Sequence, residues 1–201
     1  MSTERFDKAA ADWDAKPLRV QLGEAISTAI IASLPLTGAM VGLEYGCGTG
    51  LVTFKLAAHL AVMHGLDSSS GMIQVLTEKI HAQGVENVKP FLGELSELAP
   101  PPLDLTCISM TLHHIEDYHE LLTRFAKYLK PGGFLAIADL EKEDGTFHDD
   151  NTGIAHFGFE GDALCKVVVE CGFVDVEMQT IYKVTKNERQ YPVFLLTCRK
   201  K

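Results

Sequence analysis

Short apolar runs alternate with amphipathic stretches along most of the chain. The apolar runs have the length of buried strands and lie at residues 39–43, 60–66, 88–92, 103–109 and 134–139. The amphipathic stretches carry apolar side chains at helical spacing and lie at residues 18–34, 51–57, 69–81, 116–130 and 161–171. Strands that alternate with helices predict a parallel sheet with helices on both faces.

The last third of the chain departs from this alternation. Residues 140–159 are polar, contain glycine and have weak periodicity, which predicts a functional loop rather than an ordinary connection. Two β-rich segments follow at 173–183 and 191–198, joined by the polar residues 185–189. They predict an antiparallel hairpin at the edge of the sheet.

Three glycines at alternate positions, Gly46, Gly48 and Gly50, directly follow the first apolar run. Without Cβ atoms, such a turn lets the backbone approach a ligand closely. Asp67 ends the second apolar run about 20 residues beyond the turn, where an acid accepts hydrogen bonds from both hydroxyls of a ribose. The strand-to-helix turn is therefore predicted to hold an adenosine.

The spacing of the glycines separates the possible adenosine cofactors. A dinucleotide fingerprint requires glycine at the sixth position, where this chain has Leu51, so NAD is disfavoured. A P-loop is disfavoured because no Lys-Ser or Lys-Thr pair follows the glycines. Glu44 makes the strand tip acidic, which suits a ligand with an amino group and a sulfonium cation. S-adenosylmethionine has both groups.

The two segments resemble the first two motifs of the class I S-adenosylmethionine-dependent methyltransferases, in the small-molecule branch labelled type 11 or type 12. Residues 44–50 look like the first motif. Residues 65–72 look like the second, with Asp67, Ser69 and Met72 in its Asp-x-Ser-x-x-Met positions. Further resemblances lie at residues 93–95, 112–115 and 129–133.

The resemblance implies a three-layer Rossmann-like sandwich around a mostly parallel seven-stranded sheet of order 3-2-1-4-5-7-6, with strand seven antiparallel. It implies that Asp67 binds the ribose of the cofactor, Met72 packs on an adenine face, and Glu94 meets the adenine edge. Glu94 departs from the usual Asp and has a longer arm. The expected cofactor-binding residues are Trp13, Glu44, Gly46, Cys47, Gly48, Gly50, Asp67, Ser68, Met72, Glu94, Leu95, Ser109 and Met110.

Two of these positions carry side chains with a second interpretation. Cys47 lies at a helix N-terminus, where a thiol can be a nucleophile, but a small residue with its side chain in the core is the simpler expectation. Trp13 lies in a charged segment that resembles the N-terminal lid of the family, where an aromatic side chain covers the cofactor. A core tryptophan is the alternative for Trp13.

Methyl transfer from a sulfonium chiefly requires alignment of the acceptor with the methyl carbon and the sulfur. An alcohol or carbon-acid acceptor also needs a base, for which His113 and His114 after the fourth strand are the candidates. A structural role for this histidine pair is an equal alternative. The loop holds His148, Asp149, Asp150, His156 and Glu160, but their spacing matches no strong zinc pattern, so no metal is expected.

The composition limits which binding partners and which cellular compartment are expected. The chain has 201 residues, 46% of them hydrophobic, and a net charge of −9. This charge disfavours a nucleic-acid partner, because a binding groove must neutralise several phosphates and the one basic cluster is the tail at 199–201. No apolar run has the length of a membrane helix, residues 1–5 do not resemble a signal peptide, and the five cysteines form no C-x-x-C pair.

We therefore expect one cytoplasmic domain over residues 1–201 that transfers a methyl group from S-adenosylmethionine to a small molecule, with no nucleic-acid or membrane partner. Residues 1–36 are expected to form a lid and a helix, 39–139 the cofactor-binding core, and 140–201 a substrate loop, a helix and a hairpin. A cofactor-binding regulator without turnover and an NAD-dependent oxidoreductase are the alternatives. The acceptor atom and the oligomeric state stay open.

Overall fold

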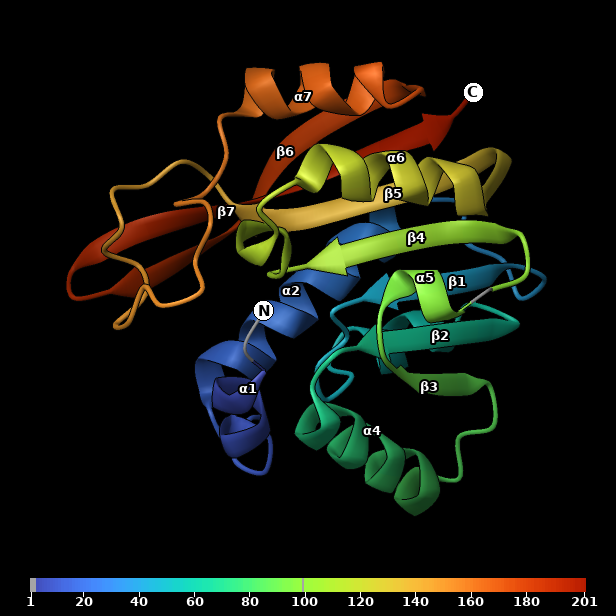
Figure 1. The fold of residues 1–201 in the computed structure, drawn as a ribbon, viewed down its shortest axis with the longest axis horizontal. Helices are drawn as coiled ribbons and strands as arrows, with labels where there is room; N and C mark the ends of the chain where they lie inside the picture. Colours follow the sequence, from blue (N-terminus) through green and yellow to red (C-terminus); the bar gives the residue numbers. More distant parts are fainter. Residues whose placement is uncertain (1–2, 99) are drawn as a thin grey trace.

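The computed structural model describes residues 3–98 and 100–201, in which seven strands form one sheet in the order β3-β2-β1-β4-β5-β7-β6 (Figure 1). The strands are β1 Val41–Tyr45, β2 Val62–Asp67, β3 Val88–Leu92, β4 Leu103–Ser109, β5 Leu129–Leu140, β6 Phe173–Lys186 and β7 Arg189–Lys200. β7 runs antiparallel to both of its neighbours, and the other pairings are parallel. The predicted fold and strand order are confirmed.

Helices cover both faces of the sheet (Figure 1). One face carries α2 Pro17–Ser33, α3 Thr53–Ala57 and α4 Ser70–Gln83, and the other carries α5 Leu95–Leu98, α6 Tyr118–Tyr128 and α7 Gly161–Glu170. A short helix α1 at Glu4–Ala9 and a 3₁₀ turn η1 at Leu112–His114 complete the elements of the described residues. Across the described ranges, no helix has the length and apolar content needed to cross a membrane.

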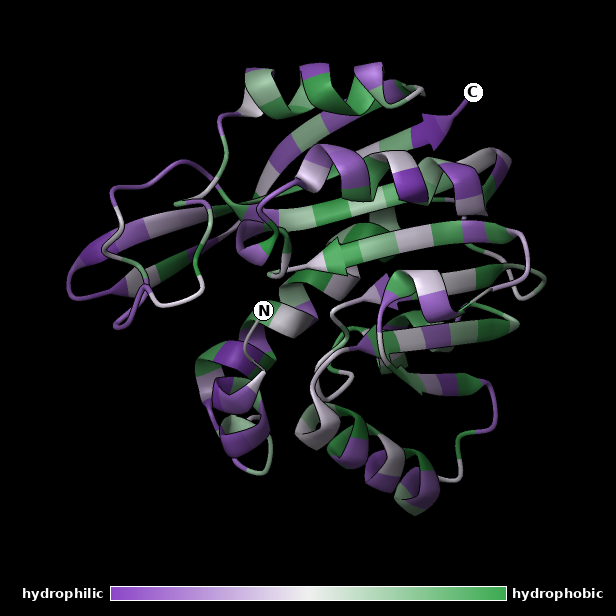
Figure 2. Ribbon diagram, in the orientation of Figure 1, coloured by the Kyte–Doolittle hydropathy of each residue, from purple (hydrophilic) through white to green (hydrophobic). Residues whose placement is uncertain are grey.

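Each central strand contributes to two hydrophobic cores, because successive side chains of a strand point to opposite faces. In β5, Ala136 and Ala138 belong to the core under α2, whereas Leu135 and Ile137 belong to the core under α6 and α7. Figure 2 shows hydrophobic residues along the central strands β4 and β5. The continuous apolar runs of the sequence are therefore strands buried on both sides.

The start of β5 differs from the predicted boundary. The helix was expected to reach residue 130, but α6 ends at Tyr128 and Leu129 already pairs with Leu103. Pairing then shifts and resumes at Phe134. Pro131 has no N–H to donate, and Gly132 has φ +80°, so the residues between bulge out of the ladder.

The hairpin turn is shorter than the predicted connection at 185–189. β6 and β7 pair up to Lys186 and Arg189, which leaves only Asn187 and Glu188 in the turn. Both residues have positive φ, at +50° and +63°, as a two-residue type I′ turn requires. Their polarity suggested a longer loop, whereas the turn type sets the length.

The topology places a ligand site at one edge of the sheet. From β1 the chain continues to β2 on one side, while β4 lies on the other, so the strand order reverses between β1 and β4. In open α/β sheets, ligands bind at the carboxyl ends of the strands beside such a switch. The expected long loop lies at this edge, without helix or strand between Leu140 and Gly161 except for one bridge from Glu141 to Phe159.

Candidate functional site

A cavity of about 1240 Å³ lies at the carboxyl ends of β1, β2 and β4. Its floor is made by the glycine turn after β1 and by the residues that follow β2, β3 and β4. Two segments cover it, residues 3–16 of the N-terminal region and residues 147–155 of the long loop. We call these two segments together the roof.

The glycine turn is shaped by backbone conformations that favour glycine. Gly46 has φ +72°, and a Cβ built there would lie 2.4 Å from Cγ2 of Thr111. Gly48 has φ +54°, but its Cβ would meet only Sδ of Met72, at 3.9 Å. Gly46 is therefore required for packing within the protein, whereas the space beside Gly48 is open toward the cavity.

Gly50 serves a different purpose. It has φ +87°, and a Cβ there would lie 2.6 Å from Cδ1 of Leu76 and 3.2 Å from the ring of Phe54. These side chains belong to the core, and Gly50 is absent from the cavity lining. The third glycine of the turn lets the backbone pack against α4 rather than against a ligand.

Asp67 joins the two motifs in space. One carboxylate oxygen accepts a hydrogen bond from Gly48 N at 2.8 Å, and the other accepts one from Ser69 N at 2.8 Å. Burial raises the pKa of the Asp67 carboxyl, and these two backbone donors oppose the shift. Each oxygen keeps a second lone pair, so the carboxylate still has two acceptor positions at the cavity.

Glu44 lies at the end of β1 with its side chain almost completely buried. Its two oxygens accept hydrogen bonds from the hydroxyls of Thr53 and Ser109, each at 2.5 Å. Burial raises the pKa of this carboxyl to about 7, although both hydroxyl donors lower it. Glu44 is thus a protonation-sensitive group directly below the glycine turn.

The segment after β4 contains a strained backbone position. Met110 has φ +49°, which is unfavourable for a side chain other than glycine or asparagine, and its N–H donates to Ala138 O at 2.8 Å. Thr111 donates to the carbonyl of Ser109 at 2.9 Å. These bonds turn the chain sharply from β4 into η1 and bring His113 and His114 to the cavity.

His113 forms a buried dyad with Asp139 at the end of β5. Nδ1 of His113 lies 2.8 Å from Oδ1 of Asp139, and the His113 N–H donates to Oδ2 at 3.1 Å. Asp139 is fully buried and also accepts a hydrogen bond from Leu140 N at 2.7 Å. A carboxylate that already accepts two backbone bonds fixes Nδ1 as the protonated nitrogen, which leaves Nε2 as an acceptor.

Two further imidazoles flank this dyad. The rings of His114 and His148 lie 4.2 and 5.0 Å from the His113 ring, measured between centroids. Burial, followed by the neighbouring histidines, lowers the pKa of His114 and of His148 to about 4. Both rings are therefore neutral at pH 7. Nε2 of His148 is buried and has no hydrogen-bond partner among the described residues.

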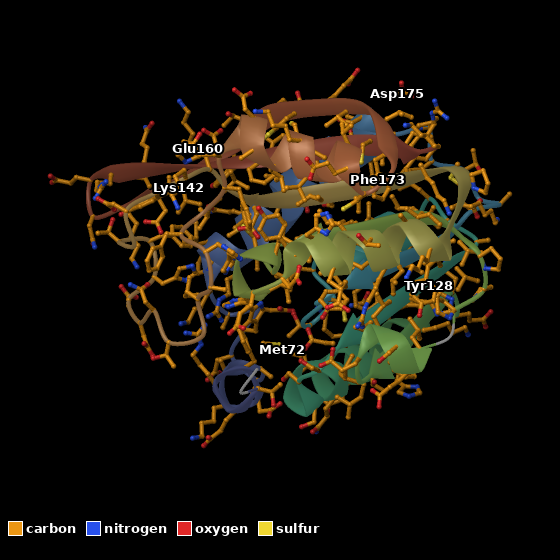
Figure 3. All side chains as sticks on the ribbon, turned by 45° about the horizontal axis from the view of Figure 1, so that its top comes forward. Met72, Tyr128, Lys142, Glu160, Phe173 and Asp175 are labelled. Carbon is orange, nitrogen blue, oxygen red and sulfur yellow. The ribbon has the colours of Figure 1, made fainter. Side chains whose placement is uncertain are left out.

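The N-terminal part of the roof is attached to both motifs. Oδ1 of Asp7 accepts hydrogen bonds from Ser69 Oγ at 2.6 Å and from Gly71 N at 2.9 Å. Oδ1 of Asp14 accepts one from Thr49 Oγ1 at 2.6 Å. Figure 3 shows Met72 at the start of α4 beside the N-terminal helix. The roof therefore closes over the two loops that form the floor.

The sequence and fold agree with known proteins. Residues 43–133 match the sequence profile of the methyltransferase domain. The chain is 32% identical over 132 residues to an uncharacterized methyltransferase of Schizosaccharomyces pombe, covering 58% of this chain and 46% of that protein. It is 31% identical over 140 residues to the ubiquinone biosynthesis O-methyltransferase of Dechloromonas aromatica, covering 67% of this chain and 55% of that protein.

A solved structure extends the similarity to the whole fold. The crystal structure of a SAM-dependent methyltransferase from Aquifex aeolicus has a TM-score of 0.73 and 17% identity, with complete coverage of both chains. The sequence match assigns residues 43–133 to the methyltransferase domain family, and the solved structure shows the same fold. This confirms the family that the motifs at 44–50 and 65–72 predicted. The chain spans about half the length of these curated relatives, 46% and 55%.

Most of the predicted site residues line this cavity. They are Trp13, Glu44, Gly46, Cys47, Gly48, Asp67, Ser68, Met72, Glu94, Ser109, Met110, His113 and His114. Gly50 and Leu95 do not line it. Leu95 is buried in the core under α5 and α6. The thiol of Cys47 is buried against Gly65 of β2, and burial raises its pKa, which disfavours a nucleophilic role.

Several residues that lie at this site were not among the residues predicted from the sequence. They are Arg5, Phe6, Asp7, Arg19, Thr111, Asp139 and His148. Asp139 could have been predicted from the sequence, because it is an acid near the carboxyl end of a parallel strand, like Asp67. His148 and Asp149 were weighed as metal ligands, but Asp149 pairs with Lys186 instead. The described residues hold no cluster of metal-ligating side chains.

Proposed function

We propose that this chain is an enzyme that transfers a methyl group from S-adenosylmethionine to a small-molecule acceptor. The observation that carries the proposal is the open space beside Gly48, flanked by the Asp67 carboxylate and by the sulfur of Met72. A nucleoside with a charged amino-acid tail fits this set of donors and acceptors. An acidic floor disfavours a cofactor with a pyrophosphate.

The residues that would hold the cofactor follow from this arrangement. Backbone groups of Gly46 and Gly48 would meet the methionine half, Asp67 would accept from the ribose hydroxyls, and Met72 would cover the adenine. The exposed Glu94 would accept from the adenine amino group. The bound cofactor supplies an electrophilic methyl group on a sulfonium sulfur. The roof excludes water and aligns the acceptor.

His113 is the proposed general base for an acceptor that must lose a proton. Asp139 holds the Nδ1 proton of His113, so Nε2 is free to accept the proton of an acceptor hydroxyl. Nε2 of His113 would take this proton and so make the acceptor oxygen a better nucleophile toward the methyl group that the bound cofactor would supply. His114 and His148 flank the dyad as neutral rings.

Three features support a small acceptor, and a fourth supports a cytoplasmic location. Both segments of the roof line the cavity, which suits a compact acceptor better than a polymer. The net charge of −9 opposes a nucleic acid. The Dechloromonas aromatica relative is named for ubiquinone biosynthesis, a small-molecule pathway. With the apolar interior and free buried cysteines, we infer a reducing, cytoplasmic setting.

Calorimetry with S-adenosylmethionine, S-adenosylhomocysteine and NAD tests the cofactor. We expect binding of both sulfur nucleosides and none of NAD. Tight NAD binding without a response to either sulfur nucleoside would refute the proposal. Turnover is then tested by S-adenosylhomocysteine release with a panel of phenols, alcohols, carboxylic acids and amines. Binding without release from any acceptor would favour the regulatory alternative.

A further inference from the structure

His148 of the long loop has a buried ring nitrogen at the cavity that the mechanism proposed above does not use. Its Nε2 is buried and has no hydrogen-bond partner within residues 3–98 and 100–201, and the residue lines the cavity. A buried polar atom without a partner costs free energy, which a ligand group that bonds to it would recover. This nitrogen is therefore a candidate contact for the acceptor.

His148 lies beside the proposed base and on the side of the site opposite the expected nucleoside. Its ring centroid is 5.0 Å from that of His113. The loop that carries it packs on β7, where the ring of Phe147 meets the ring of Tyr191 at 5.3 Å. In the sheet, β7 lies beyond β4 and β5, whereas Asp67 ends β2 on the other side of β1. The acceptor rather than the cofactor would therefore meet His148.

The end of β6 fixes the loop segment that carries His148. Nζ of Lys186 donates to the carbonyl oxygen of Phe147 at 2.6 Å and to Oδ1 of Asp149 at 2.7 Å, so it holds the residues on both sides of His148. Lys186 is the last residue of β6, next to the hairpin turn (Figure 1). The Phe147 ring also meets the His148 ring edge-on at 4.9 Å. A rigid element thus supports the imidazole, as the orientation of a substrate requires.

The charge state of His148 limits which group it can bind. Burial, then His113 and His114, and then Arg5 lower the pKa of His148 to about 4, so the ring is neutral at pH 7. Each nitrogen of a neutral imidazole donates or accepts one hydrogen bond, according to the tautomer. A hydroxyl group fits either tautomer because it both donates and accepts, whereas a carboxylate only accepts. The positive charge of Arg5 disfavours an ammonium group here. A hydroxyl group is therefore the partner that fits best.

His113 and His148 together define a pair of contacts. Asp139 holds the proton on Nδ1 of His113, so Nε2 of His113 is the acceptor for the reacting hydroxyl. With hydrogen bonds of ordinary length, two rings whose centroids are 5.0 Å apart can each bond to one of two oxygens on neighbouring carbons.

We propose that Nε2 of His148 binds a second hydroxyl of the acceptor, on the carbon next to the one that bears the reacting hydroxyl. His148 then selects acceptors with two adjacent hydroxyls, as in a catechol or another vicinal diol. The inference rests on the proposed function and on His113 as the base.

Calorimetry with catechol, phenol and benzoate on protein saturated with S-adenosylhomocysteine tests the assignment. Catechol should bind to the wild-type protein about fivefold to tenfold more tightly than phenol, because it makes one further uncharged hydrogen bond. In His148→Phe, which keeps a ring and removes both nitrogens, the catechol affinity should fall to that of phenol. The phenol affinity should not change.

Two further variants complete the test. His148→Gln should restore part of the preference for catechol, because its amide group reaches the position of Nε2. His81→Phe is the matched control, since it changes an exposed histidine in the last turn of α4, and it should keep the wild-type preference.

Three results would overturn the assignment. The first is equal affinity of catechol and phenol for the wild-type protein, or an equal loss of both in His148→Phe. The second is binding of neither, because two adjacent hydroxyls would then not be what the site recognises. The third is benzoate binding that depends on His148 while catechol binding does not, because His148 would then bind a carboxylate.

The affinity for S-adenosylhomocysteine separates this inference from the proposed function. His148→Phe should bind S-adenosylhomocysteine as the wild-type protein does, which also shows that the variant is folded, and His148→Gln serves in its place if it is not. If the wild-type protein does not bind S-adenosylhomocysteine, the proposed function fails. If it does, and catechol and phenol bind alike, only the role of His148 is wrong.

Discussion

Gly48 and Gly132 allow the effect of backbone strain to be separated from the effect of filling the cavity. Both have positive φ, at +54° and +80°, and neither would crowd a Cβ. Alanine at either position should therefore cost about 1 kcal/mol of unfolding free energy, measured by chemical denaturation. Only Gly48→Ala should also weaken S-adenosylhomocysteine binding, by about tenfold or more, because its methyl group enters the open space. Equal affinity in the two variants would show that no ligand approaches the turn.

The buried Glu44 makes stability depend on pH. Its pKa is raised from 4.5 to about 7, so between these values the folded protein binds a proton that the unfolded chain has lost. Stability therefore falls as the pH rises from about 4.5 to about 7 and levels off above, by an amount of order 3 kcal/mol at most.

Glu44→Gln removes this titration. Denaturation curves at several pH values should show a smaller fall in stability between pH 4.5 and 7 than in the wild-type protein. Glu24→Gln, at the exposed ion pair with Lys55, is the control and should keep the wild-type slope. A wild-type slope in Glu44→Gln would mean that this carboxyl ionises at its ordinary pKa.

At the scale of elements, α1 depends on its contact with α4. Six residues are too few for a helix that is stable in isolation, so α1 is held by tertiary contacts. Asp7 supplies them by accepting bonds from Ser69 Oγ and Gly71 N at the N-terminus of α4, where a negative charge is also favourable. The same bonds lower the pKa of Asp7, so this docking is lost only as acid protonates the carboxyl.

Asp7→Ala should release α1 from the cavity. Hydrogen exchange of residues 4–16 should become faster, and the dissociation rate of S-adenosylhomocysteine should rise severalfold, because the roof opens more often. Glu4→Ala removes an acid of the same helix that pairs only with Lys8, and it should change neither rate. Asp7→Ala with the wild-type dissociation rate would show that the ligand leaves by another route.

At the scale of the whole molecule, the two parts of the roof touch each other. Arg5 Nη1 lies 3.3 Å from the carbonyl oxygens of Asp150 and Thr152. Both parts also contact His114 of η1, whose ring meets the Phe6 ring edge-on at 5.4 Å and whose Nδ1 lies 2.8 Å from Gly153 O. Ligand binding should therefore slow hydrogen exchange in residues 4–16 and in residues 147–155 together. In Arg5→Met, the loop should keep its fast exchange while α1 is still protected. Joint protection in that variant would show that each segment responds to the ligand alone.

The sequence predicts the parts of this protein that depend on neighbours along the chain. Apolar runs predict the strands. The glycine turn and the acid that ends the next strand predict that Gly48 and Asp67 lie close together, because the carboxyl ends of parallel strands meet at the same edge of a sheet. The boundaries of β5 and of the hairpin were missed, since a bulge at Pro131 and a type I′ turn at Asn187 depend on pairing across strands.

The roof could not be predicted in the same way. Asp7 and Ser69 are 62 residues apart, and Arg5 reaches across 145 residues to Asp150. Contacts between segments without regular periodicity leave no pattern in either segment. Arg19 shows the same limit, because a surface arginine on a helix and an arginine stacked on Trp13 have the same sequence signature.

Gly71 determines how closely α1 can pack against the start of α4, at the edge of the cavity. A Cβ at this position would lie 2.8 Å from the carbonyl oxygen of Asp7 and 2.9 Å from its Cα, so the first helix sits against a bare backbone. Any side chain at this position would push α1 away from α4. The residence time of a bound ligand, and with it the rate of ligand exchange, should therefore depend on the absence of a side chain at Gly71.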